Sequence, residues 1–292
     1  MHTITIVGGG PAALAASLVL SRSCRKPVVI CGDLTVEAPE VSARERIAAS
    51  WTKLKDFGAE VIPERAIAVS QLESGAFSLR LSSERILRSR ALLLCTGITE
   101  KPPQIEGIHE LWGTLVHSCL YCHGWEVQGE PLAVIGHGDR GAHLAIRARG
   151  WSHDVTLYTD GAQPSASLIT DLTNLGINLQ SAPVLSVDKA PTGLNVTTKS
   201  STAEHRCMFV VPTVRQQSNL AEQLGCRMRH VEELDLAEGA VATDTAGQTS
   251  VRMVFAAGTL VDPTLRVAGA EGQGNIVAIA TNEELMRAGF LY

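Results

Sequence analysis

The N-terminal stretch of this sequence predicts a strand, a glycine turn, a helix and a second strand. Residues 3–7 are a β-rich apolar run, residues 8–10 are three consecutive glycines, and residues 12–20 have apolar side chains at helical spacing. A second apolar run follows at 28–31. A βαβ unit opened by a glycine turn is typical of parallel sheets that bind nucleotides, and this restricts the fold more than any other feature.

The same order of elements occurs again in the middle of the chain. A strand is predicted at 132–135, a glycine turn at 136–141, a helix to about Arg149 and a strand at 154–158. Two such units in a chain of 292 residues predict an α/β protein with two Rossmann-like nucleotide-binding domains.

The first turn has the spacing of a dinucleotide-binding motif. Gly8 allows a tight bend, Gly10 lets the backbone approach a pyrophosphate, and the small Ala13 lets helix and strand pack closely. Pro11 and Ala12 open the helix, whose N-terminus supplies N–H groups to phosphates. We therefore assign these five residues to a cofactor site; an ordinary βα turn is the alternative.

An acidic residue follows the second strand of each unit. Asp33 lies about twenty residues past the first turn, where a carboxylate can accept from a ribose hydroxyl, although a solvated turn aspartate is equally compatible. The second turn, Gly136-x-Gly138-x-x-Gly141, has the same spacing as the first. The segment after its strand, "LYTDGAQPS", has no Arg or Lys, and Asp160 would repel a 2′-phosphate. NADPH is therefore disfavoured there, while NADH remains open.

Cys119 and Cys122 are the close pair among seven cysteines, and the others lie mostly in apolar runs typical of buried reduced thiols. His117 and His123 flank the pair. A zinc site would need a second ligand pair, which the sequence does not have, so we expect no metal. A buried structural pair is possible, but a CxxC that opens a helix has a lowered thiolate pKa, which favours a redox dithiol.

Charge and hydropathy limit the partners. The net charge is −5 and no basic block occurs, which argues against nucleic acid or an anionic membrane surface as partner. No apolar run is long enough to span a bilayer, and the first strand begins too early for a signal sequence. We therefore expect a soluble, cytoplasmic protein.

Four stretches together resemble the low-molecular-weight thioredoxin reductase family of flavoproteins. They are "IVGGGPAALAA", "LLLCTGITEKPPQIEG", the CxxC before the second βαβ unit, and "VFAAGTLVDP" before a terminal helix. The resemblance implies a thioredoxin reductase-like fold of two three-layer ββα domains: a discontinuous FAD-binding domain at 1–114 and 238–292, and a second domain at 115–237. It also implies FAD as cofactor, a homodimer, and further FAD contacts from Thr96, Gly97, Gly258 and Thr259.

Within that family, "CLYCHGWE" is similar to the dithiol oxidases that close disulfides in microbial natural products such as holomycin, romidepsin and gliotoxin. This implies a small-molecule dithiol substrate whose electrons pass through Cys119 and Cys122 to FAD and then to O2. It further implies that Cys119, nearer the surface, exchanges with the substrate and that Cys122 faces the flavin. His123 replaces the family's acid/base aspartate and can transfer protons near neutral pH; a polar residue without a role is the alternative.

Two departures from the family pattern are visible. Thr259 stands where members usually have Asp, and a hydroxyl binds the flavin's ribityl chain more weakly than a carboxylate. The stretch 33–46 is also shorter than the family's flavin-covering loop. A pyridine-nucleotide-dependent disulfide reductase acting on a thioredoxin-like protein, and a non-catalytic paralogue, therefore remain alternatives.

Overall fold

The chain forms two compact units in the computed structural model, which describes residues 1–32, 51, 53–231, 236 and 238–290. The first unit comprises Met1–Thr99 and Val214–Tyr292, and the second comprises Glu100–Thr213. The division is discontinuous, as the sequence predicts, but its boundaries lie at 99/100 and 213/214 in place of 114/115 and 237/238.

The boundary segments are assigned by the cores into which they pack. Ile105 and Ile108 are buried in a core of the second unit, although the sequence placed them in the first. Leu220 and Cys226 are buried in the core of the first unit, although the sequence placed them in the second. Short strands β7 (Ile98–Lys101) and β16 (Thr213–Gln216) pair with each other where the chain passes between the units.

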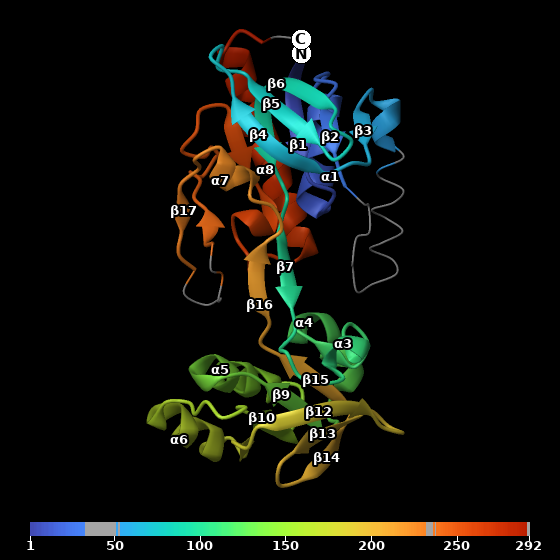
Figure 1. Cartoon of the computed structure of the whole chain (residues 1–292), viewed down its shortest axis with the longest axis vertical. Coiled ribbons are helices and arrows are strands. Elements are labelled where there is room, and N and C mark those ends of the chain that lie inside the picture. The colour runs from blue at the N-terminus through green and yellow to red at the C-terminus, as the bar shows by residue number, and fades with distance from the viewer. Residues whose placement is uncertain (33–50, 52, 232–235, 237, 291–292) are drawn as a thin grey trace. The chain divides into compact units, whose positions relative to one another are not determined.

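A seven-stranded sheet forms the centre of the first unit (Figure 1). The strand order is β3-β2-β1-β6-β5-β4, and β19 also pairs with β6. The strands that pair in parallel are β1 (His2–Val7), β2 (Val28–Ile30), β3 (Glu60–Ile62), β6 (Ile86–Leu94) and β19 (Val254–Ala256), whereas β4 (Ala66–Gln71) and β5 (Phe77–Leu81) run antiparallel. Strands β2 and β19 are wholly buried, and β1 and β6 are buried over their last four residues, because both faces of the sheet are covered there.

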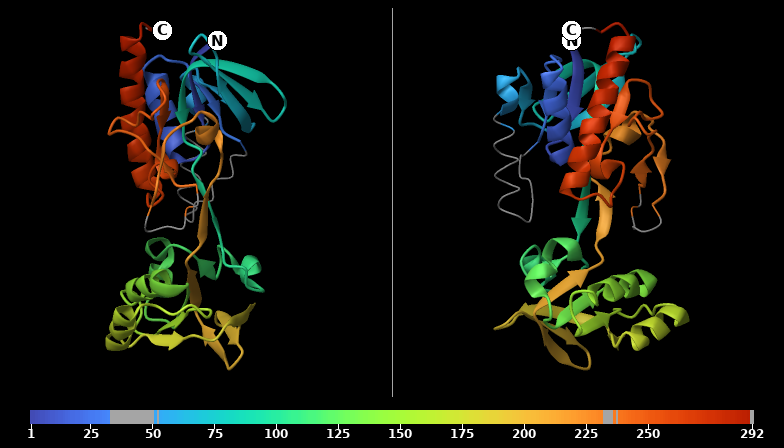
Figure 2. Two further views of the ribbon diagram at one scale, coloured as in Figure 1. Left: turned by 60° about the vertical axis from the view of Figure 1, so that its left-hand side comes forward. Right: turned by 180° about the vertical axis from the view of Figure 1, so that it is seen from behind.

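Helices α1 (Pro11–Arg22) and α8 (Val267–Arg287) pack against each other over this sheet (Figure 2). Their contact is close: a Cβ atom on Gly274 would lie 2.2 Å from the carbonyl oxygen of Ala12. The unit is completed by α7 (Leu220–Gln223), β17 (Met228–Arg229), β18 (Ala240–Val241) and the 3₁₀ turn η2 (Gly258–Leu260). The predicted N-terminal βαβ unit and terminal helix are confirmed, with helix ends that differ by one or two residues.

The second unit has three layers, as the ββα prediction requires. Its central five-stranded sheet is wholly parallel in the order β11-β10-β9-β15-β8. The strands are β8 (Val116–His117), β9 (Leu132–Ile135), β10 (Val155–Tyr158), β11 (Asn178–Gln180) and β15 (Cys207–Val210). Helices α5 (Gly138–Ala148) and α6 (Ala166–Asn174) form one outer layer, and the antiparallel strands β12 (Val184–Lys189), β13 (Leu194–Thr198) and β14 (Thr202–His205) form the other.

Alternation along β9 explains this layering. Leu132 and Val134 are buried in the core that contains the apolar residues of α5. Ala133 and Ile135 are buried in the opposite core, with Val184 of β12. Successive side chains of a strand point to opposite faces, so this one strand joins both cores.

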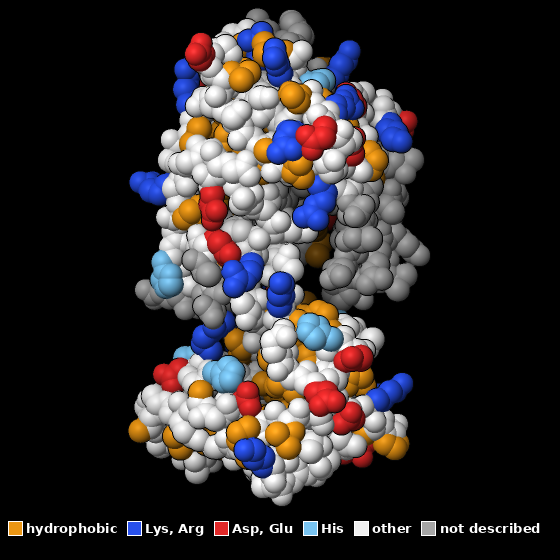
Figure 3. Space-filling model, in the orientation of Figure 1, with side chains coloured by type: hydrophobic (Ala, Val, Ile, Leu, Met, Phe, Trp, Pro, Cys, Tyr) orange, Lys and Arg blue, Asp and Glu red, His pale blue; other side chains and the backbone are white. Residues whose placement is uncertain are grey.

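No helix in the described part of the chain is long and apolar enough to cross a membrane. On the face of the first unit shown in Figure 3, acidic and basic side chains are interspersed.

Candidate active site

The first glycine turn is wedged between the ends of β6 and β2. A Cβ atom on Gly8, whose φ is +142°, would lie 2.1 Å from the carbonyl oxygen of Cys95. One on Gly9 would lie 2.5 Å from that of Cys31. A side chain is therefore excluded at both positions, because backbone atoms of the neighbouring strands cannot move away as a flexible side chain could.

Gly10 differs from its neighbours because the space around it is open. A Cβ there would meet no atom within 4 Å. Gly10 caps α1, Pro11 is the first helical residue, and Ala13 is fully buried against the sheet. The first N–H groups of a helix have no intrahelical acceptor, so this open, dipole-favoured end fits a pyrophosphate.

Residues predicted from three distant motifs meet at this end of α1. The Oγ1 atom of Thr259 lies 3.1 Å from the place where a Cβ on Gly97 would stand, and a Cβ on Gly258 would lie 2.9 Å from the Cβ of Ala12. Gly97 and Gly258 have φ of +71° and +82°, which only glycine adopts readily. Thr96, half-buried, precedes Gly97. Asp33 lies outside the described residues.

Gln273 of α8 holds the loop that contains Gly258 and Thr259, and the sequence did not indicate this. Its Oε1 atom accepts a hydrogen bond of 2.6 Å from the Gly258 N–H. No motif includes this glutamine, because its role depends on how α8 passes the loop at 257–260. The residues present thus fit FAD: an open turn, a helix N-terminus and a hydroxyl, with Thr259 in place of the usual carboxylate.

The second glycine turn keeps the geometry of a nucleotide turn. A Cβ on Gly141 would lie 2.0 Å from the oxygen of Gly136, whereas one on Gly138, whose φ is +53°, would make only an ordinary contact of 3.9 Å with the Gln163 oxygen. After β10, the carboxylate of Asp160 accepts from the Val184 N–H at 2.9 Å. No lysine or arginine occurs between Arg149 and Lys189.

Cys119 and Cys122 form a disulfide at the carboxyl end of β8, with 5.3 Å between their Cα atoms. Because β8, β15, β9 and β10 are parallel, their carboxyl ends share one edge of the sheet, where open α/β sheets bind ligands. The disulfide and the second glycine turn therefore lie at the same edge of this unit.

The helix expected from the CxxC is only one turn long. Cys119 caps α4 (Leu120–His123), which is followed by Gly124 and the 3₁₀ turn η1 (Trp125–Val127). A Cβ on Gly124 would lie 2.6 Å both from the Leu120 oxygen and from the Trp151 ring, so the chain turns here against Trp151. The helix that the CxxC opens is therefore shorter than expected, and the lowered thiolate pKa remains a prediction.

Two aromatic side chains beside the disulfide are exposed and do not belong to the core. Tyr121 is 76% exposed and Trp125 is 75% exposed. Tyr121 meets the ring of Trp151 edge-on, with 5.2 Å between centroids. These two rings therefore form an exposed apolar surface next to the disulfide.

The two flanking histidines stack on each other. The ring centroids of His117 and His123 are 3.8 Å apart and the planes meet at 18°. Burial lowers the pKa of His117 to about 4, helped by repulsion from His123. Burial also lowers the pKa of His123, while Glu126 opposes this shift. Both shifts favour the neutral form of the imidazole rings beside the disulfide.

The remaining cysteines are free thiols. Four are buried, and only Cys24 is exposed. Burial raises the pKa of Cys95 and of Cys207 to about 12, so both stay protonated and unreactive. In the described part of the chain, no group of three or more His, Cys, Asp or Glu residues is placed to hold a metal ion.

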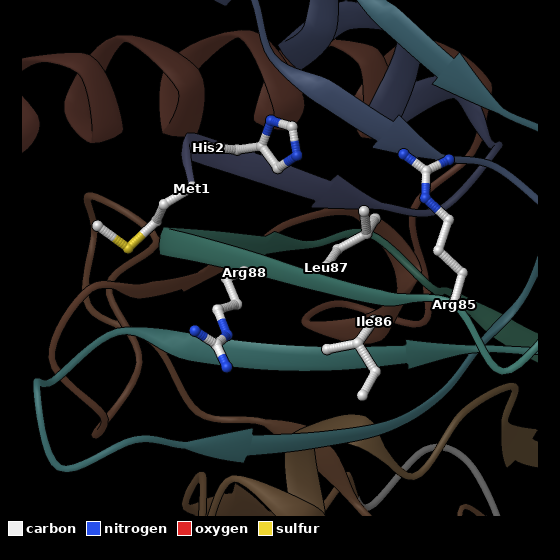
Figure 4. Close-up of a pocket in the computed structure, with 6 residues that line it drawn as sticks. All are labelled: Met1, His2, Arg85, Ile86, Leu87 and Arg88. Atoms are coloured by element: carbon white, nitrogen blue, oxygen red, sulfur yellow. The ribbon is translucent and has the colours of Figure 1, made fainter.

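A separate surface hollow lies where β1 and β6 begin (Figure 4). It is lined by Met1, His2, Arg85, Ile86, Leu87 and Arg88, none of which belongs to the predicted site.

Comparison with known proteins identifies the family. The model of the pyridine nucleotide-disulphide oxidoreductases matches residues 2–274. The chain belongs to this family. It is a thioredoxin reductase-like flavoprotein oxidoreductase, as the sequence motifs predicted.

Several individual members are similar over much of their length. Thioredoxin reductase aclD of Aspergillus oryzae is 30% identical over 181 residues, which are 56% of this chain and 58% of that protein. Thioredoxin reductase tcpT of Claviceps purpurea is 25% identical over 283 residues, 87% of this chain and 84% of that protein.

Solved structures agree with the fold. The HlmI crystal structure is 28% identical, with a TM-score of 0.90 over 99% of this chain and 93% of that one. A putative thioredoxin reductase from Bacillus anthracis is 24% identical, with a TM-score of 0.89 over 99% of this chain and 100% of that one. The predicted two-domain fold is therefore confirmed.

Proposed function

We propose that this protein is an FAD-dependent dithiol oxidase that closes an intramolecular disulfide in a small-molecule natural product, with O2 as the final electron acceptor. One observation carries the proposal. The chain keeps a redox disulfide flanked by neutral histidines, yet the segment after β10 offers no cation to an NADPH 2′-phosphate. Because NADPH is disfavoured at this turn, we assign a thiol substrate as the source of electrons.

The exchange chemistry balances at the cysteine pair. A substrate thiolate attacks one sulfur of the Cys119–Cys122 disulfide, and the other sulfur leaves as a thiolate. The second substrate thiol then attacks the mixed disulfide, which releases the oxidised substrate and leaves two cysteine thiols. Two protons leave the substrate in this sequence, and His123, directly after Cys122, is the base that we assign to them.

The cofactor is FAD in this proposal, held by the glycine turn at 8–10, the N-terminus of α1, Gly97, Gly258 and Thr259. When bound, it supplies a two-electron acceptor that can be reoxidised by O2 with release of hydrogen peroxide. This chain's residues cradle its phosphates and carry the dithiol exchange.

A second candidate function has support of its own. At the second glycine turn a Cβ on Gly138 would make only an ordinary contact, and both curated relatives described above are named thioredoxin reductases. A disulfide reductase that takes electrons from NADH would use this turn. The two functions differ in the direction of electron flow, and this can be measured directly.

Anaerobic mixing of the purified flavoprotein with a model dithiol, NADPH or NADH distinguishes them. We expect dithiothreitol to bleach the flavin absorbance near about 450 nm at least about tenfold faster than either pyridine nucleotide does. Admission of air should then restore the absorbance and yield one hydrogen peroxide per dithiol oxidised. Faster bleaching by NADH or NADPH would reject the oxidase.

A variant of a cysteine outside the disulfide provides the control for this experiment. Cys24→Ser alters the exposed free thiol and should behave as wild type. A colourless protein that cannot be reconstituted with FAD would instead support a non-catalytic paralogue.

A further inference from the structure

The stacked histidine pair bridges two different elements on either side of the disulfide. His117 ends strand β8, and His123 ends α4. The two bonded cysteines lie between them in the sequence. The chain turns at 118–119, and this turn brings the two ring centroids to 3.8 Å from each other.

His117 is held in place by the surrounding structure. Its side chain is buried, and its Nε2 lies 3.0 Å from the carbonyl oxygen of Thr114. A carbonyl only accepts, so Nε2 carries a hydrogen, and the low pKa of the ring makes the neutral Nε2–H tautomer the favoured form. On the neighbouring strand β15, Phe209 pairs with His117 and packs its ring 6.1 Å away.

His123 is the less buried of the two and comes directly after Cys122. Two imidazolium rings at this separation would repel each other, so at most one of them takes a proton. Burial lowers the pKa of His117 to about 4, so the less buried His123 is the ring to which we assign the proton.

We propose that His117 is a positioning residue for His123: its anchored ring provides the apolar stacking face that orients the His123 imidazole beside the cysteine pair and shields it from water. The proposal deepens the function argued above, on which it rests only for the identity of the proton donor, a substrate thiol. The positioning role explains why His117, which does not readily take up a proton, stacks on His123, which does.

Charged groups on the neighbouring elements do not provide this shielding. Glu126 of η1 acts on both rings in the opposite direction, because a carboxylate favours the imidazolium form. Glu100 of β7 accepts a hydrogen bond from the Ser118 hydroxyl. The lowered pKa of His123 has burial as its largest cause, and the His117 ring covers one face of it.

The test is an NMR titration of His123 in the oxidised full-length protein, labelled at histidine Cε1. In His117→Val, which removes the ring from a strand position, the pKa of His123 should rise towards the ordinary histidine value. In His117→Phe, which keeps an aromatic face, it should stay low. His117→Gln also lacks a ring but keeps a hydrogen-bond donor for the Thr114 carbonyl. The pKa of His123 should rise in this variant too, and it replaces His117→Val if the valine variant does not fold.

His205→Gln is the matched control, because His205 is also buried but bonds Tyr158 at 2.8 Å and should not affect His123. An unchanged His123 pKa in both ring-less variants, or an equal rise in His117→Phe, would overturn the proposal. A kinetic readout follows: kcat/KM for dithiol oxidation should fall severalfold more at pH 6 than at pH 8 in His117→Val. If the wild type oxidises no dithiol but the titration behaves as stated, the proposed function fails and the positioning role stands.

Discussion

Cys119 and Cys122 form one disulfide but differ in their exposure to solvent. Cys119 is 9% exposed, at the junction of β8 and α4, whereas Cys122 is half-buried on the α4 turn. This order of exposure is the reverse of the one that the family resemblance implied. It arises because the one-turn helix places its outer side at Cys122, while Cys119 is drawn towards the sheet with Leu120.

Exposure therefore predicts which sulfur an external reagent reaches first. Cys119→Ser, which leaves Cys122 as a free thiol, should form a mixed disulfide with a small added disulfide faster than Cys122→Ser does, as followed by intact-protein mass spectrometry. Both variants should lower dithiol turnover by about a thousandfold or more, because each removes half of the exchange machinery. Faster capture by Cys122→Ser would support the order that the resemblance implies.

The sequence pointed to the cysteines and to His123, but not to the histidine stack. His117 and His123 are six residues apart, a spacing that brings side chains together in neither a strand nor a helix. Their contact depends on a strand end, a turn and one helical turn in succession. Periodicity describes single elements, so geometry across such a junction could not be read from it.

At the scale of elements, long periodic segments were predictable and short ones were not. The terminal helix was expected after "VFAAGTLVDP" and spans Val267–Arg287. The helix expected from the CxxC stops after four residues, because Gly124 must fit beneath Trp151. That restraint comes from a residue twenty-seven positions away and has no local signal.

The contact between α1 and α8 gives a prediction at this scale. Gly274→Ala should destabilise the protein by about 1–3 kcal/mol, because the new Cβ would lie 2.2 Å from the Ala12 oxygen and the helices would have to separate. Gly272→Ala, on the exposed side of the same helix, should stabilise it by about 0.5–1 kcal/mol, since nothing lies within 4 Å of its Cβ position. Urea unfolding of both variants measures the difference; equal effects would show that the helices are not this close.

Loosening this contact should also affect the cofactor. Ala12 touches Gly258, so the helix pair fixes the loop that carries Thr259. Gly274→Ala should therefore retain less FAD after gel filtration than Gly272→Ala does.

On the scale of the whole molecule, the two glycine turns were enough to predict two nucleotide-type domains, and the family match confirms that fold. The domain boundaries were displaced because the segments 100–114 and 214–237 lack a pattern of their own. Their membership is decided by the core that each one completes, which is a property of the folded chain.

The expected homodimer also belongs to this scale and remains a prediction. Ile276, Ile279 and Met286 of α8 are 58%, 49% and 43% exposed, and their spacing of three and seven residues places them on one face of the helix. A second copy of the chain would bury this stripe. Ile276→Glu with Ile279→Glu should therefore convert a dimer to a monomer in analytical ultracentrifugation, because two charges would have to be buried without partners. Ile86→Glu is the matched control, since Ile86 on β6 is 60% exposed and borders the separate hollow of Figure 4. A wild-type protein that sediments as a monomer, or a dimer lost equally in both variants, would rule out this face as the interface.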